Sequence, residues 1–157
     1  MEKTKQVSVF LENKPGRLAN VLSALAREKV NLTALTVMDS HEHNVLRFVP
    51  DNAAAAAQVL KGLGIPFAET EVVLVELRNQ PGALAHVCEV LAAEHVGIDY
   101  AYCSAGGRNG RTMGVFKLSN VEKAMRVLGE SPINSARRRP QIRPVRDRRT
   151  YQPPAFR

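Results

Sequence analysis

The chain contains no tryptophan, and aromatic residues make up only 5% of its 157 residues. The hydrophobic fraction is nevertheless 45%, so a packed core must be built mainly from Val, Leu, Ile and Ala. No apolar run approaches the roughly 18 residues that a membrane-spanning helix requires. The start of the chain also lacks the apolar stretch of a secretory signal peptide. These absences predict a cytoplasmic protein with no membrane partner.

Cysteine is scarce as well, with only Cys88 and Cys103. They form neither a CxxC pair nor a zinc spacing, so we expect both to be small buried hydrophobic side chains. His41 and His43 fall in a predicted polar turn, which needs no metal to explain its composition. We therefore predict no metal ion and no cofactor.

Sequence motifs of catalysis are missing too. The chain has no Gly-x-Ser-x-Gly nucleophile turn, no His-Glu-x-x-His zinc motif, no phosphate-binding loop and no dinucleotide fingerprint. We predict no catalytic residues and a protein that is not an enzyme.

Excess charge of one sign is confined to the C-terminal end. The formal net charge is +7, but residues 1–134 hold 14 Lys and Arg against 14 Asp and Glu. Residues 135–157 hold eight Arg and one acidic residue, Asp147. This tail has no apolar periodicity with which to fold alone, and we interpret it as a solvated extension. Electrostatic contact with nucleic acid or an acidic protein surface is the alternative.

The most informative feature of the sequence is an internal repeat. A shift of 66 residues aligns positions 7–30 with positions 73–96, and 13 of these 24 positions are identical. The chain is therefore a duplication. We expect one domain over residues 1–70, a second over residues 71–134 and the basic tail over residues 135–157.

Each copy has the pattern of a β-α-β-β-α-β unit. Alternating apolar residues predict a first strand over residues 7–11 and again over residues 73–77, and the apolar spacing that follows predicts an amphipathic helix. Two more strands, a second helix and, in the first copy, a short strand near residues 66–69 complete the unit. No final strand is evident in the second copy, where only Ile133 could begin one. The predicted fold is α+β, with two ferredoxin-like antiparallel sheets that carry their helices on one face and pair side by side.

The motif Asn-x-Pro-Gly-x-Leu lies between the first strand and the first helix of both copies, at residues 13–18 and 79–84. Together with Val30-Asn31-Leu32 at the start of the next strand, it makes the chain resemble a tandem ACT-domain protein of the free-standing regulatory type. The resemblance covers roughly residues 6–130. In that family, ligands that are typically amino acids bind where two ACT modules meet, against the loop that carries the Asn and the Pro-Gly.

The resemblance implies that both loops and one residue outside them bind the ligand. These residues are Asn13, Lys14, Pro15, Gly16, Arg17, Leu18, Asn31, Asn79, Gln80, Pro81, Gly82, Ala83 and Leu84. Elementary chemistry agrees, because the first-turn N–H groups of a helix attract a carboxylate and Gly lets a ligand approach the main chain.

The two loops are not equivalent. The cations Lys14 and Arg17 are replaced by neutral residues in the second copy, and Gly97 stands where the first copy has Asn31. We therefore expect the first loop to bind an acidic group better. The alternative is that the motif is only a strand-to-helix turn in which Asn caps the helix.

The predicted function is regulatory binding of an amino acid at an ACT–ACT interface, by a homodimer or with a metabolic enzyme in trans. A regulatory subunit of a biosynthetic enzyme, similar to the small subunit of acetolactate synthase, is an alternative. A nucleic-acid-binding protein that acts through the basic tail is less favoured, because the folded part is neutral and lacks the basic-aromatic pattern of RNA-binding scaffolds.

Overall fold

The two copies of the repeat form one continuous β-sheet. The computed structural model describes residues 1–38, 43–107 and 111–131. Its elements are β1 (Glu2–Glu12), α1 (Arg17–Arg27), β2 (Leu32–Met38), β3 (His43–Pro50), α2 (Ala53–Gly62), β4 (Phe67–Arg78), α3 (Ala83–Ala93), β5 (Ile98–Gly107), β6 (Arg111–Leu118) and α4 (Val121–Glu130). The strand order is β2-β3-β1-β4-β6-β5, and all neighbouring strands are antiparallel.

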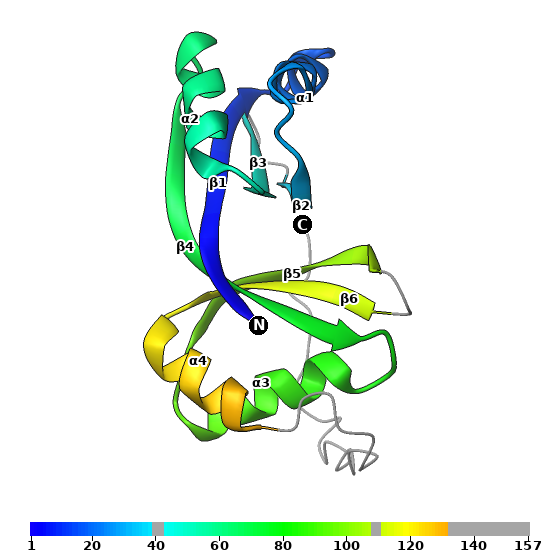
Figure 1. The fold of residues 1–157 in the computed structure, drawn as a ribbon, viewed down its shortest axis with the longest axis vertical. Helices are drawn as coiled ribbons and strands as arrows, with labels where there is room; N and C mark the ends of the chain where they lie inside the picture. The colour runs from blue at the N-terminus through cyan, green and yellow to red at the C-terminus, as the bar shows by residue number, and fades with distance from the viewer. Residues whose placement is uncertain (39–42, 108–110, 132–157) are drawn as a thin grey trace, which may run out of the picture.

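Strands β1 and β4 belong to both units and run between the upper and lower halves of the molecule (Figure 1). Their ladder extends from the pair Val9–Phe67 to the pair Glu2–Leu74. The start of β4 thus closes the first sheet, and the start of β1 closes the second. The position of the final strand that the second copy seemed to lack is therefore filled by the first half of β1.

The prediction of separate strands near residues 66–69 and over residues 73–77 is wrong, because β4 runs without a break through both. The physical reason is local, since Phe67–Arg78 contains no Gly, Pro or Asn that would turn the chain. The boundary that we expected between residues 70 and 71 falls inside this strand.

Each unit has its own core between the sheet and two helices. Helices α1 and α2 cover one half of the sheet, and helices α3 and α4 cover the other (Figure 1). Lys3 lies opposite Val73 in the ladder, so these two side chains are on the same face of the sheet. Lys3 also shares a face of β1 with Val7, because alternate residues of a strand point to the same side. Val7 and Val73, which belong to the two cores, are therefore on one face, and both helix pairs cover that face. The predicted pair of antiparallel units with helices on one face is confirmed.

Nine of the ten buried residues in the first core have an identical counterpart in the second. The pairs are Val7/Val73, Val9/Val75, Leu11/Leu77, Val21/Val87, Leu25/Leu91, Val30/Val96, Phe48/Phe116, Ala56/Ala124 and Leu60/Leu128. The duplication has therefore kept the side of the sheet that faces the helices almost unchanged.

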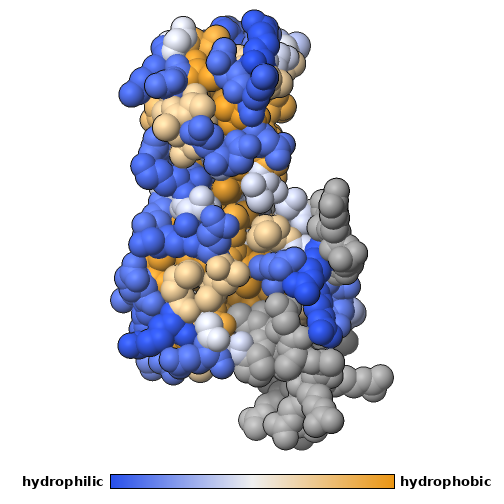
Figure 2. Space-filling view, viewed as in Figure 1, coloured by the Kyte–Doolittle hydropathy of each residue, from blue (hydrophilic) through white to orange (hydrophobic). Residues whose placement is uncertain are grey.

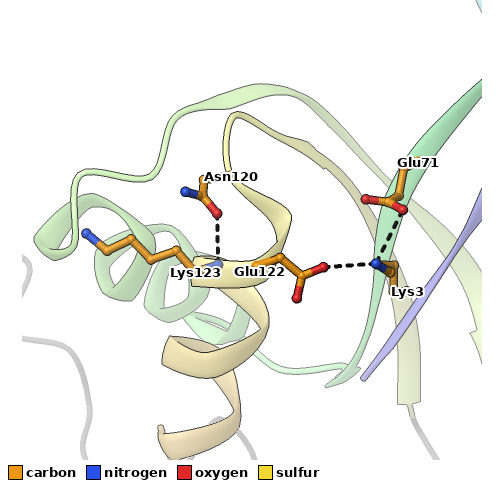
Figure 3. A network of polar contacts seen from close by, with 5 residues as sticks. All are labelled: Lys3, Glu71, Asn120, Glu122 and Lys123. Carbon is orange, nitrogen blue, oxygen red and sulfur yellow. Dashed lines mark hydrogen bonds and ion pairs between the residues drawn. The ribbon is translucent and has the colours of Figure 1, made fainter.

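Asn side chains start the second helix of each unit. The Asn52 side chain accepts a hydrogen bond from the Ala55 amide at 3.0 Å, and Asn120 accepts one from the Lys123 amide at 2.9 Å. Figure 3 shows the second of these caps beside Lys3, whose ammonium group lies 2.9 Å from Glu122 of α4. The start of β1 thus contacts a helix of the second unit as well as its sheet.

The helix-free face of the sheet closes on itself. The edge strands β2 and β5 come into contact there, and side chains from both units form a third cluster that we call the seam. Its apolar members are Ala34, Val49, Val72, Leu74 and Val115, and its polar members are Gln6, Ser8, Arg47, Tyr100 and Tyr102.

The surface on the side shown in Figure 2 is mostly hydrophilic, with apolar side chains showing between the polar ones. Among the described residues, seven large hydrophobic side chains are exposed, and Phe10, Leu35, Val37 and Met38 are four of them. The last three lie on the edge strand β2. Cys103 is also exposed, contrary to our expectation, because it lies on the other edge strand, β5.

No helix in the described part of the chain is long and apolar enough to cross a membrane. Within residues 1–38, 43–107 and 111–131, no three His, Cys, Asp or Glu side chains are grouped to hold a metal ion. His41, Ile133 and the basic tail lie outside the described residues.

Candidate ligand-binding turns

Both predicted loops form the same turn, which places a glycine at the N-cap of a helix. Gly16 has a φ of +86° and Gly82 a φ of +87°, a left-handed conformation that glycine adopts without strain. Neither helix has a side-chain cap. The N–H groups of Arg17 and Ala83 donate to the carbonyls of Lys14 and Gln80 at 3.3 Å. The next two amides of each first turn have no acceptor within the helix and are available to a ligand.

Asn13 does not cap the helix, so the alternative interpretation of the motif as an Asn-capped helix start is wrong. Its side-chain oxygen accepts a hydrogen bond from the Asn44 amide on β3 at 3.1 Å. In the second turn, Gly82 is likewise the N-cap of α3, with no side-chain hydrogen bond from Asn79.

The cations of the first turn are paired with an acidic residue that precedes the motif. Lys14 and Arg17 each lie 3.0 Å from the Glu12 carboxylate, and their hydrogen bonds hold the pKa of Glu12 below its usual value. In the second copy, Arg78 stands at the position of Glu12. Each turn therefore carries one net positive charge, and the charge difference behind the expected preference for the first turn disappears.

Most of the predicted site residues are on the surface. Leu18, Gly82 and Ala83 are half-buried, and Leu18 and Ala83 pack against the first and second cores. The exposed residues are Asn13, Lys14, Pro15, Gly16, Arg17, Asn31, Asn79, Gln80, Pro81 and Leu84. The turns are thus open surfaces within one chain, not enclosed pockets.

The structure does not bring Asn31 close to either turn. The first turn follows the end of β1, next to the start of β3, whereas Asn31 precedes β2 beside the end of β3. Seven residues of β2 separate these two ends, a distance of roughly 20 Å. The two turns themselves follow the outer ends of β1 and β4, so they lie at opposite ends of the shared ladder.

The main chain at Asn31 has a structural role in both copies. Its N–H donates to the Asp51 carboxylate at 3.0 Å, and the N–H of Gly97 donates to the Ser119 hydroxyl at 2.9 Å. Both bonds tie the start of the second strand to the turn before the second helix. The Asn31 side chain remains exposed.

A second group of polar side chains lies in the seam, and no pattern in the sequence indicates it. Gln6 is fully buried, and its amide nitrogen donates to the Ser8 hydroxyl at 3.2 Å and to the Tyr100 hydroxyl at 2.7 Å. The Tyr102 hydroxyl donates to the Gln6 amide oxygen at 3.1 Å. Burial raises the pKa of Tyr102 well above its usual value.

Comparisons with known proteins agree with the fold. A family model described as an ACT domain pair matches residues 2–136. The chain belongs to the ACT domain pair family. Among solved structures, protein BT0572 from Bacteroides thetaiotaomicron is 39% identical, with 82% of this chain and 88% of that chain covered and a TM-score of 0.76. None of the curated proteins compared matches this ACT domain pair.

More distant structures share only the fold. The ligand-free regulatory subunit of aspartate kinase from Thermus thermophilus is 16% identical, with 82% of this ACT domain pair and 96% of that chain covered and a TM-score of 0.61. The corresponding subunit from Thermus flavus is also 16% identical, with 82% and 92% covered and a TM-score of 0.57.

Proposed function

We propose that this ACT domain pair is a non-catalytic regulatory protein that binds an amino acid at its two Pro-Gly turns. One observation carries the proposal: both turns hold a left-handed glycine at the N-cap of a helix that has no side-chain cap. A ligand carboxylate suits the second and third amides of each first turn and the partial positive charge of the helix end. Asn13 and Asn79 offer both a donor and an acceptor beside it.

A second copy of the chain completes the site in this proposal. Strand β2 is an edge strand with β3 as its one hydrogen-bonded neighbour in the described sheet, and it exposes Leu35 by 39% and Val37 by 42%. At the other edge, β5 has the small residues Ala101 and Cys103 at the corresponding positions. Isologous pairing of two β2 strands gives a closed homodimer, because among the described residues the large exposed apolar side chains of the two edges lie on β2 and not on β5.

Such pairing also explains the distant position of Asn31. Two β2 strands that pair antiparallel place the start of one beside the end of the other. Asn31 of the second copy then lies near the first turn, at an interface between two ACT units.

The direct test is a thermal-shift screen of the full chain against the twenty amino acids, followed by calorimetry. A ligand at a hundred times its Kd should add about 2.7 kcal/mol of stability. The response should disappear in the Asn13→Ala, Asn79→Ala variant and persist in Asn20→Ala, which changes an exposed residue of α1. No shift from any amino acid at millimolar concentration contradicts the proposal.

Homodimer formation is tested by light scattering after gel filtration. Leu35→Thr with Val37→Thr keeps strand-forming residues but removes apolar surface, so it should shift the protein toward monomer. Ala101→Thr with Cys103→Thr is the matched control on β5 and should leave the mass unchanged. A wild-type monomer at tens of micromolar would refute this part of the proposal.

A metabolic enzyme is the target in trans that we propose for the regulator. The support is that this chain shares its fold with a protein from Thermus thermophilus that is a regulatory subunit of aspartate kinase. The association with aspartate kinase is a property of that protein. The test is copurification with the tagged full chain. A larger enzyme that binds the tagged chain, and whose binding depends on the amino acid, would be identified as the target.

A further inference from the structure

The seam holds an arginine that has no carboxylate partner among the described residues. The Arg47 guanidinium lies 4.2 Å from the centre of the Tyr100 ring, a cation–π contact between the two units. Its Nε atom is fully buried, and no described residue accepts a hydrogen bond from it. The described hydrogen bond of this group goes from Nη1 to the Met38 sulfur at 2.9 Å, and a thioether is a weak acceptor.

The hydroxyl group of Tyr100 also has an unused donor. Its oxygen accepts a hydrogen bond from Gln6, but its own proton goes to no acceptor in the described part of the chain. Tyr102 differs, because its hydroxyl proton is already donated to Gln6. The seam thus places a guanidinium with a buried, unpaired N–H against a phenol whose O–H has no acceptor in the described part of the chain.

Neither of these donors has a counterpart at the corresponding position of the other copy. Arg47 lies opposite Ser8 in its ladder, and Val115 lies opposite Leu74 at the corresponding place in the second unit. Tyr100 corresponds to Ala34 under the 66-residue shift. The pair Arg47 and Tyr100 is therefore not repeated at the corresponding positions, whereas the cores beneath the helices are almost identical.

We propose that Arg47 and Tyr100 bind the carboxylate of a small ligand in the seam between the two ACT units. The terminal Nη1 and Nη2 groups of the planar guanidinium offer parallel N–H donors that match the two oxygens of a carboxylate, and the phenol adds a third donor. Met38 must turn away from Arg47, which its exposed and unbranched side chain permits. This site is separate from the Pro-Gly turns and does not depend on the function proposed for them.

Tyrosine spectroscopy can test this site directly, because the chain has three Tyr and no Trp. In a Tyr151→Phe background, the remaining emission comes from Tyr100 and Tyr102. Sodium acetate, titrated at constant ionic strength against sodium chloride, should give a saturable change with a Kd in roughly the millimolar range. Chloride alone should give none.

Variants show whether acetate binds at the seam or elsewhere on the protein. Arg47→Gln should abolish the acetate response, Arg47→Lys should weaken it about tenfold and Tyr100→Phe should weaken it severalfold. Tyr102→Phe changes only a donor that is already used, so its acetate Kd should stay within about twofold. The Asn13→Ala, Asn79→Ala variant should respond as the wild type does, which distinguishes failure of the turns from failure of the seam.

Three results would overturn the proposal. The first is no saturable response up to about 0.3 M acetate, a concentration far above a millimolar Kd. The second is an equal response in Arg47→Gln, with folding checked by circular dichroism. The third is a response that appears only when Asp39→Asn and Glu42→Gln neutralise the two acidic residues that follow Met38 in the sequence. Such a result would mean that a carboxylate of the chain itself occupies Arg47.

Discussion

Lys5 of β1 and Glu71 of β4 lie directly opposite each other, and the 66-residue shift that relates the two copies converts one into the other. A pseudo-twofold axis therefore passes between them. The ion pairs on either side, Lys3–Glu71 at 3.5 Å and Lys5–Glu69 at 2.6 Å, are images of each other. Since β1 supplies both cations and β4 both anions, β1 is suited to pair with β4 and not with a second β1.

The first prediction concerns this charge pattern. Lys5→Glu places three carboxylates together and should lower the free energy of unfolding by about 1 kcal/mol. Adding Glu69→Lys should recover part of the loss, with a coupling energy of about 0.2–1 kcal/mol in a double-mutant cycle. Urea denaturation of the wild type, the two single variants and the double variant measures this coupling energy. Purely additive effects would show that the ion pair contributes nothing.

The second prediction concerns the strand shared between the units. Deleting residues 1–5 removes the ladder partners of residues 71–74, so the second unit should loosen although its own sequence is intact. Hydrogen exchange should show faster exchange in β4 and β6 than in the wild type. The Lys3→Ser, Lys5→Ser variant keeps the backbone and serves as the control, with smaller changes expected. Unchanged protection of β6 after the deletion would contradict the pairing.

The third prediction compares two phenols in the seam. Tyr102→Phe leaves the buried Gln6 oxygen without its donor and should cost about 1–3 kcal/mol of stability. Tyr100→Phe should cost less, because the Gln6 nitrogen keeps its bond to Ser8. Thermal denaturation of both variants measures the difference. The reverse order would mean that the hydrogen bonds of Gln6 are assigned to the wrong tyrosines.

The fourth prediction concerns strain at corresponding helix ends. Lys29 has a φ of +56° and His95 a φ of +54°, where a residue with a Cβ is disfavoured. Lys29→Gly and His95→Gly should each raise the free energy of unfolding by about 0.5–1 kcal/mol. Lys29→Ala keeps the Cβ and should bring no such gain. Chemical denaturation measures the free energy of unfolding of the Gly and Ala variants. Equal effects of Gly and Ala would exclude backbone strain as the cause.

The fifth prediction concerns acid stability at the first turn. Lys14 and Arg17 lower the pKa of Glu12 in the folded state, so its ion pairs stabilise the fold above the ordinary Glu pKa of about 4.3. This contribution is lost as the pH falls through the folded pKa. Glu12→Gln should therefore lose less stability than the wild type between about pH 5 and 2.5. Glu28→Gln removes an exposed carboxylate that makes no ion pair among the described residues, and it serves as the control.

The cores under the helices were predictable because their signal is periodic and local. Alternation such as Val7, Val9 and Leu11 shows the buried face of a strand, and helical spacing shows the matching face of the helix. The glycine turns were predictable for the same reason. Each depends on neighbours within a few positions of the sequence.

The seam was not predictable, because burial there depends on how the twisted sheet closes. Gln6 and Ser8 occupy the strand positions that alternate with the core, which normally face solvent. The pairing of β1 with β4 was missed for a related reason, since the polar residues Lys3 and Lys5 do not have the pattern of a strand. Glu12, which pairs with Lys14 and Arg17, lies one residue before the motif that we recognised. Its negative charge was therefore left out, and the positive charge of the first turn was overestimated.

The exchange of strands between the units also constrains how this protein can be made. Residues 2–5 leave the ribosome well before their partners at residues 71–74, which are synthesised only after the rest of the first copy. A nascent chain that contains the first copy alone therefore carries half a strand with an unpaired edge. Translation must proceed into the second copy before the start of β1 can be paired, and a second copy made alone would lack the strand that closes its sheet.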